Sequence, residues 1–263
     1  MQKTILEYRA TLNHNSEVFL LNFKDEFTAF TDTDNSLYRI GLFLSQNRTK
    51  DEESLISFLP YLLIMQRQFR NAFQCFTVFQ SYQGWVLLRP GLESSLIMGK
   101  WLDDMQNVEI WKKHKQDWKE YNKTYSGKSL ISKSLPESSS IQQVLKRIND
   151  NFMHVNPSYY YHNTRLEQMQ ADSDFLYVPV FDQETDYQSH LYSFLHLTLY
   201  VVKCVGEMLV PYFSQNDTFE INLARLEEAF KGKVARILQQ SPDQLSVLTE
   251  LGLWPNNTFQ RRP

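Results

Sequence analysis

The chain has 263 residues, of which 42% are hydrophobic and 22% charged, so it is long enough to form a hydrophobic core and is not a disordered polyampholyte. Its 8 glycines and 9 prolines are too few for collagen, flexible linkers or an all-β fold dense in turns. The formal net charge of −3 argues against a generally basic nucleic-acid-binding protein. With 14% aromatic residues, we expect one soluble, aromatic-rich, all-α domain spanning 1–263.

Apolar residues recur every three or four positions along several segments, which is the spacing of a buried helix face. The strongest such segment is 51–80, in which Pro60 predicts either a kink or a later start. A second helix is expected over 85–103, with Pro90-Gly91 bending it or delaying its start. About seven helices are predicted: a core from 51–80, 85–103, 141–153 and 190–213, and further helices at 108–121, 218–237 and 242–251. Residues 1–34 are expected to form an additional N-terminal helical arm.

Two segments do not have this helical spacing. Residues 124–140 are rich in Ser, Lys, Gly and Pro and predict an internal loop, with Ser138–Ser140 capping the helix that follows. Residues 165–182 combine aromatic and β-branched residues with Pro179. They predict a small irregular or β-like insertion, with a hairpin around Ala171–Asp174.

Metal, cofactor and membrane chemistry are not expected. Cys75 and Cys204 have apolar neighbours and no Cys-x-x-Cys partner, which predicts buried free thiols, and the six histidines are scattered. The most membrane-like stretch, 191–213, contains His196, Lys203 and Glu207, so it favours a buried core helix. We therefore expect a cytoplasmic protein without zinc, iron or another cofactor.

The segment RINDNFMHVNPSYYY, residues 147–161, has the most informative polar pattern. On an α-helix, Arg147, Asn151 and His154 fall within about 60° of one another. Their stripe lies about 120° away from the apolar stripe of the same helix. That apolar stripe consists of Ile141, Val144, Leu145, Ile148 and Phe152. The polar stripe is therefore expected to face solvent, a cleft edge or a subunit interface.

The Arg147-x6-His154 spacing resembles the motif of the HEPN superfamily of helical bundles (higher eukaryotes and prokaryotes nucleotide-binding), an Arg followed by a His near the end of a helix. The resemblance implies metal-independent RNA cleavage across a homodimer, with His154 handling the proton and Arg147 the phosphate charge, and Asn151 beside them. It also implies a bacterial defence or toxin setting. Catalytic members usually place a polar residue directly after the Arg, whereas this chain has Ile148.

Two further groups could belong to such a site. Arg89 and Glu93 stand four residues apart on an otherwise apolar helix, and either form a structural ion pair or line the same cleft as His154. Together with the later His154-Val155-Asn156-Pro157, they are similar to a group of uncharacterised bacterial helical proteins with an Arg-x3-Glu helix. The adjacent Tyr159, Tyr160 and Tyr161 either stack on bases or cover a helix junction.

Two functions remain open at this point. The first is a HEPN-like, homodimeric protein that binds RNA or nucleotides or cleaves RNA without metal. The second is a non-catalytic helical interaction or scaffold protein, because a His at a helix C-terminus interacts well with the helix dipole in any helical protein. A cleft that joins Arg89, Glu93, Arg147 and His154 would favour the first function. The short basic stretch Trp111–Lys115 either contacts phosphate or is a solvated helix face.

Overall fold

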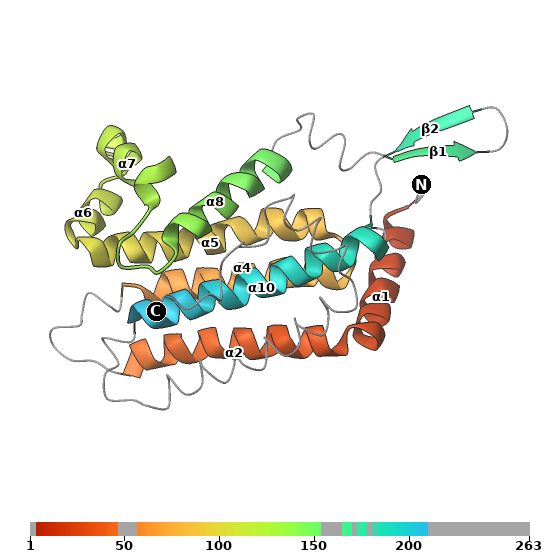
Figure 1. Cartoon of the computed structure of the whole chain (residues 1–263), viewed down its shortest axis with the longest axis horizontal. Coiled ribbons are helices and arrows are strands. Elements are labelled where there is room, and N and C mark those ends of the chain that lie inside the picture. Colours follow the sequence, from red (N-terminus) through yellow and green to blue (C-terminus); the bar gives the residue numbers. More distant parts are fainter. Residues whose placement is uncertain are drawn as a thin grey trace, which may run out of the picture.

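The computed structural model describes residues 4–46, 57–153, 165–169, 173–177, 181–182 and 184–209. This part of the chain is an all-α, multi-helix bundle with one small hairpin, as the sequence predicts (Figure 1). The helices are α1 (Ile5–Asn22), α2 (Lys24–Gln46), α4 (Leu59–Thr77), α5 (Ser81–Asp103), α6 (Gln106–Lys112), α7 (Trp118–Tyr125), α8 (Ser138–Ile148) and α10 (Glu184–Leu209).

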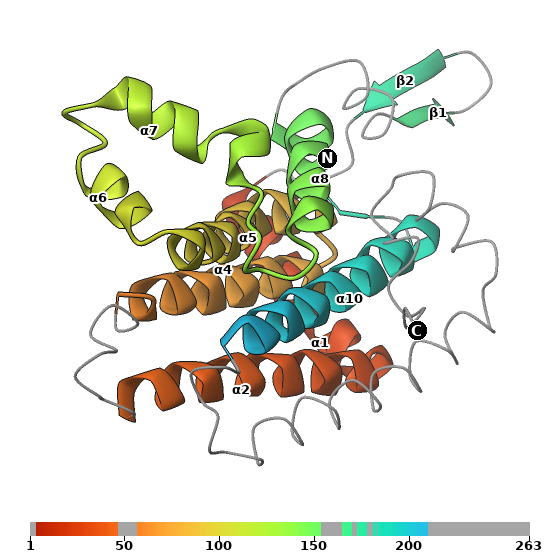
Figure 2. The same ribbon diagram turned by 60° about the vertical axis from the view of Figure 1, so that its left-hand side comes forward.

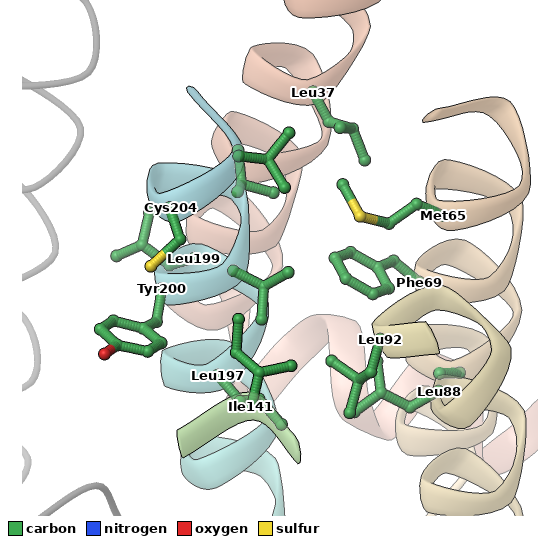
Figure 3. Close-up of a cluster of buried hydrophobic side chains, with 14 of the residues drawn as sticks. Leu37, Met65, Phe69, Leu88, Leu92, Ile141, Leu197, Leu199, Tyr200 and Cys204 are labelled. Atoms are coloured by element: carbon green, nitrogen blue, oxygen red, sulfur yellow. The ribbon is translucent and has the colours of Figure 1, made fainter. Parts of the chain in front are cut away.

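Four long helices, α2, α4, α5 and α10, run side by side along the long axis of the molecule (Figures 1 and 2). Helix α1 crosses one end of this bundle, α6 and α7 project from the other end, and α8 lies over α5. Side chains from α2, α4, α5, α8 and α10 meet in one core (Figure 3). Phe69 of α4 is 2% exposed within it, which confirms its predicted place in the buried aromatic seam.

Two glycines of α5 allow it to approach α4 closely. A Cβ atom added at Gly84 would lie 2.5 Å from the ring of Phe76, and one at Gly91 would lie 2.7 Å from the ring of Phe69. These separations are far below van der Waals contact, so only glycine fits without moving a buried ring.

Helix α10 is buried on nearly every side between Leu191 and Leu209. Tyr200 and Cys204 lie on the side of α10 that is turned away from α4 and α5, yet they are 8% and 2% exposed (Figure 3). A helix that is apolar all round is typical of the centre of a large bundle. No described helix, α10 included, has the length and apolar character needed to cross a membrane.

Helix α4 begins later than the predicted 51–80. Pro60 stands in its first turn, where a missing N–H costs no hydrogen bond. Of the two predicted alternatives, a kink or a later start, the later start therefore holds. The helix ends at Thr77, and Phe79 adopts φ 60°, which no continuing right-handed helix allows. Residues 51–56 lie outside the described part of the chain.

Helix α5 begins earlier than the predicted 85, and Pro90 lies within it. Of the two predicted alternatives for Pro90-Gly91, a bend or a delayed start, the delayed start is therefore wrong. The physical reason is a contact from far along the chain. The carboxylate of Asp182 accepts the backbone N–H of Ser81 at 2.7 Å, while the N–H of Asp182 donates to the Phe79 carbonyl at 2.8 Å. Asp182 thus caps α5 and holds the turn between α4 and α5.

The predicted helix 108–121 is two helices, α6 and α7. The Asp117 carboxylate accepts the N–H of Glu120 and starts α7 as a separate helix. The predicted loop 124–140 is also shorter than expected, because α7 includes Tyr125 and a 3₁₀ turn covers Gly127–Leu130.

Ser138–Ser140 do not cap α8 as predicted. Glu137 precedes the helix with φ 54° and makes no side-chain cap, and the Ser138 hydroxyl donates to the Ser132 carbonyl instead. The loop is held by Asp103 of α5, whose carboxylate accepts the N–H groups of Lys133 and Ser134. These hydrogen bonds lower the pKa of Asp103 even though burial opposes the shift.

The β-like insertion is a two-stranded antiparallel hairpin, β1 (Arg165–Met169) and β2 (Ser173–Tyr177), as predicted (Figure 1). Arg165 pairs with Tyr177 and Met169 with Ser173. The predicted N-terminal arm, 1–34, does not end where a helix ends, because position 34 lies inside α2. There Asp34 forms an ion pair of 2.7 Å with Arg70 of α4. The predicted helices 218–237 and 242–251 lie outside the described residues.

Candidate functional site

Helix α8 separates a buried face from an exposed one at the residues that the sequence singles out. Ile141, Val144, Leu145 and Ile148 are buried against the bundle, whereas Arg147, in the last turn, is exposed. Arg147 therefore lies outside the core on a rigidly packed helix. A guanidinium in this position is available to an anionic ligand.

The chain continues from α8 as a π-helical segment, Asn149–Met153, and not as the α-helix predicted to reach 153. Hydrogen bonds in a π-helix skip one more residue than in an α-helix, so the phase calculated for a regular α-helix does not extend to Asn151. Asn151 is half-buried here. Single-turn π segments occur frequently at functional sites.

Phe152 fixes the π-helical segment to α5. The hydroxyl of Tyr82 donates to the Phe152 carbonyl, and the Phe152 ring stacks on Trp85 with ring centres 6.0 Å apart. The Trp85 indole N–H in turn donates to Nδ1 of His190, on α10, at 3.1 Å. Because an indole N–H is only a donor, Nδ1 of His190 is the acceptor in this contact. Helices α5 and α10 and the π-helical segment therefore meet at one junction.

One turn after Trp85, α5 carries the predicted pair of Arg89 and Glu93. Their charged groups form an ion pair of 2.7 Å, and each side chain is about one third exposed, at 33% and 30%. Burial raises the pKa of Glu93, and the charge of Arg89 opposes that shift. Burial, followed by the nearby Glu93 carboxylate, also raises the pKa of Tyr121 on α7. Glu93 is therefore close enough to α7 to affect that phenol electrostatically.

The structure brings these sequence-predicted residues onto neighbouring elements without joining them directly. Within the described part of the chain, no hydrogen bond or ion pair links Arg147 or Asn151 to the Arg89–Glu93 pair. His154 and the three tyrosines Tyr159, Tyr160 and Tyr161 lie outside the described residues, so the predicted cleft around His154 stays a prediction.

Tyr82, Trp85 and His190 were missed by the sequence reasoning. Tyr82 and Trp85 precede Arg89 by two helical turns and one helical turn, respectively, a spacing that places them near it on α5. Their partners are 70 and 105 residues away in sequence, however, and no local pattern predicts such contacts.

The described residues contain no group of three or more His, Cys, Asp or Glu side chains that could hold a metal ion. Cys204 is buried and Cys75 half-buried, and both are free thiols. Burial raises the pKa of each, with that of Cys204 raised to about 12. Neither cysteine therefore has the thiolate character of a nucleophile.

Comparison of the chain with protein-family models, with curated proteins and with solved structures finds no match.

Proposed function

We propose that this protein is a HEPN-like helical protein that binds RNA or nucleotides where α8 and the π-helical segment meet α5. The observation that carries this proposal is the position of Arg147. It is exposed at the end of a well-packed helix, and the chain directly after it is anchored to α5 one turn before Arg89. A cation held in this way suits the phosphate group of a nucleotide.

RNA cleavage is the catalytic form of the same proposal. It requires a base near the ribose 2′-hydroxyl and a cation near the phosphate, and the family resemblance gives these roles to His154 and Arg147. No metal ion takes part in this chemistry. Asn151, with both a donor and an acceptor on its side chain, would orient a base or a sugar.

The test compares Arg147→Ala with Lys146→Ala on a mixed-sequence single-stranded RNA in the presence of EDTA. Lys146 is the neighbouring exposed cation and serves as the matched control. Arg147→Ala should weaken RNA binding at least tenfold, and His154→Ala should abolish cleavage while it retains binding. A wild-type protein that neither binds nor cuts RNA would contradict the proposal, as would equal effects of the two cation variants.

A second candidate function, a helical interaction or scaffold protein, is favoured by an apolar pocket of about 200 Å³ between α2 and α4. Tyr38 and Leu63 line the pocket and are 56% and 62% exposed. Exposed apolar surface of this kind marks interaction sites.

For this candidate function, the first partner to test is a second copy of the chain. Light scattering of the wild type and of Leu63→Glu measures the oligomeric state directly. Both candidate functions allow a wild-type dimer, but only the scaffold function predicts that the charge at Leu63 converts it to a monomer. A monomeric wild type would contradict the predicted homodimer.

A further inference from the structure

An aromatic ladder runs along one face of α7 from the core to the surface. Tyr125 is 7% exposed, Tyr121 is half-buried and Trp118 is 60% exposed. Successive rings are stacked, with centres 5.3 Å apart for Tyr121 and Tyr125 and 5.2 Å apart for Trp118 and Tyr121, each pair at 29°. The ladder therefore ends in an indole ring that is open to solvent.

The inner end of the ladder is rigidly held. The indole N–H of Trp101, on α5, donates to the Tyr125 hydroxyl at 3.0 Å, and that hydroxyl donates to the carbonyl of Asn107. The Trp111 ring also packs edge-on against Tyr125, with ring centres 5.1 Å apart. The position of Trp118 is thus supported through stacked rings, and a flat ligand would meet a surface that is already formed.

The segment that carries the ladder has a net positive charge. Residues 106–130 contain six lysines and three acidic residues, so this part of the chain is positive although the whole chain has a net charge of −3. Two of the lysines are paired with glutamates of their own helices, Lys112 with Glu109 and Lys123 with Glu120. Lys115 and Lys119 flank Trp118, are exposed, and form no ion pair with a described residue.

From this arrangement we propose that the Trp118 face of α7 binds single-stranded nucleic acid. An unpaired base stacks on the free face of Trp118 and extends the aromatic ladder, while Lys115 and Lys119 contact the phosphates on either side. Base–aromatic stacking beside a cationic groove is the usual way in which proteins bind single strands without sequence preference. A duplex buries its base faces and cannot stack in this way.

The projection of α6 and α7 from the end of the bundle supports this occupant (Figure 2). Helix α7 is thereby set apart from the four long helices (Figure 2). Trp118 is also exposed although Trp85 and Trp101 are buried. The choice of RNA as the strand rests on the proposed function, whereas the stacking surface itself does not.

The experiment measures binding of a fluorescein-labelled 12-nucleotide oligouridylate and of a matched RNA duplex by the full chain at low salt. Trp118→Ala should weaken binding of the single strand about five- to a hundredfold, and Trp118→Phe should restore most of it. Phe27→Ala, which removes an exposed aromatic ring from α2, is the matched control and should change nothing. The double variant Lys115→Gln, Lys119→Gln should reduce the slope of log affinity against log salt by about 1.4.

The outcomes separate this inference from the proposed function. Weaker binding by Trp118→Ala together with unchanged binding by Arg147→Ala supports the stacking surface and contradicts the site at α8. The reverse pattern overturns the stacking surface and leaves the site at α8 standing. Equal loss for Trp118→Ala and Phe27→Ala, tighter binding of the duplex, or no binding of either RNA by the wild type also overturns the stacking surface.

Discussion

The α4–α5 interface and the α6–α7 region use aromatic residues in opposite ways. Between α4 and α5, the rings of Phe69 and Phe76 press against glycines and are 2% exposed or less. In α7, rings stack on one another toward the surface and end in Trp118, at 60% exposure. The two regions are joined by α5, which runs from the first to the second.

The comparison shows that the neighbours of a ring, and not the ring itself, decide its role. Gly84 and Gly91 remove side-chain volume opposite Phe76 and Phe69, so a phenyl ring fits flush against helix backbone and loses contact with water. Among the described residues no such partner covers Trp118, which is 60% exposed, and lysines stand beside it. An aromatic ring in the first setting stabilises the fold, whereas a ring in the second setting is available to a ligand.

The largest expected effect is at the α4–α5 interface. Phe69→Ala should lower the free energy of unfolding by about 3–5 kcal/mol, because it leaves a cavity against Gly91. Denaturant unfolding measures this loss, with Leu63→Ala, on the exposed side of α4, as the control that changes stability by about 0.5 kcal/mol or less. A loss below about 1 kcal/mol for Phe69→Ala would remove Phe69 from the core.

The buried helix α10 should make stability depend on pH. His196 is 2% exposed, and burial lowers its pKa to about 4, whereas an unfolded histidine titrates near 6.5. The unfolded state therefore binds more protons between these values, so stability is complete above about pH 6.5 and falls by about 2–4 kcal/mol as the pH drops to about 4.

Unfolding measured at several pH values tests this dependence on His196. His196→Leu should flatten the curve in that window, whereas Ser193→Ala, a buried polar neighbour that does not ionise, should leave its shape unchanged. An identical pH curve for His196→Leu and the wild type would show that other groups cause the dependence.

An effect of intermediate size on stability is expected when alanine replaces glycine. Its sign should differ between Gly84, which closely contacts α4, and Gly41, which faces open space. Alanine favours a helix over glycine by about 1 kcal/mol, yet Gly84→Ala should destabilise the protein by about 1–3 kcal/mol because its Cβ meets the Phe76 ring. Gly41→Ala in α2, where nothing lies within 4 Å of the added Cβ, should stabilise it by up to about 1 kcal/mol. Thermal unfolding of both variants measures the contrast, and two changes of the same sign would refute the close α4–α5 approach.

The smallest effect on stability is expected at Trp118, the exposed residue of α7. Trp118→Ala removes one stacking partner of Tyr121 and should cost about 1 kcal/mol or less of stability. Trp101→Ala, at a ring that is 3% exposed, should cost about 3–5 kcal/mol in the same denaturant measurement. If both variants lose equal stability, Trp118 is a structural residue and α7 has no free aromatic face.

Local sequence information predicted the elements of the fold better than their ends. The periodicity that places Phe69 in a buried seam was confirmed, and so was the hairpin near 165–182, because amphipathic spacing and turn residues act within one segment. The start of α5 at Ser81 was missed because its cap comes from Asp182, which is 101 residues away in the sequence. The division of 108–121 depended on Asp117, a cap that sits within an otherwise helical pattern.

At the candidate site, too, local patterns predicted some features, whereas others depend on contacts between distant residues. Spacing alone predicted that Arg147 lies outside the apolar face of its helix, and Arg147 is exposed. The ion pair between Arg89 and Glu93 was one of two predicted alternatives. The π-helical turn at Asn151 and the contacts of Phe152 with Tyr82 and Trp85 could not be read from any local pattern.

The sequence by itself determined the helical class, the buried seam of α4 and the side of α8 on which Arg147 stands, because each follows from the order of apolar and polar residues along a single helix. Only the tertiary structure decided which glycines face which rings, where α5 begins and that Trp118 forms the exposed end of a ladder. These features depend on contacts between residues that are distant in sequence, or on what surrounds a side chain in space. The energy of such contacts arises only when the chain has brought the partners together.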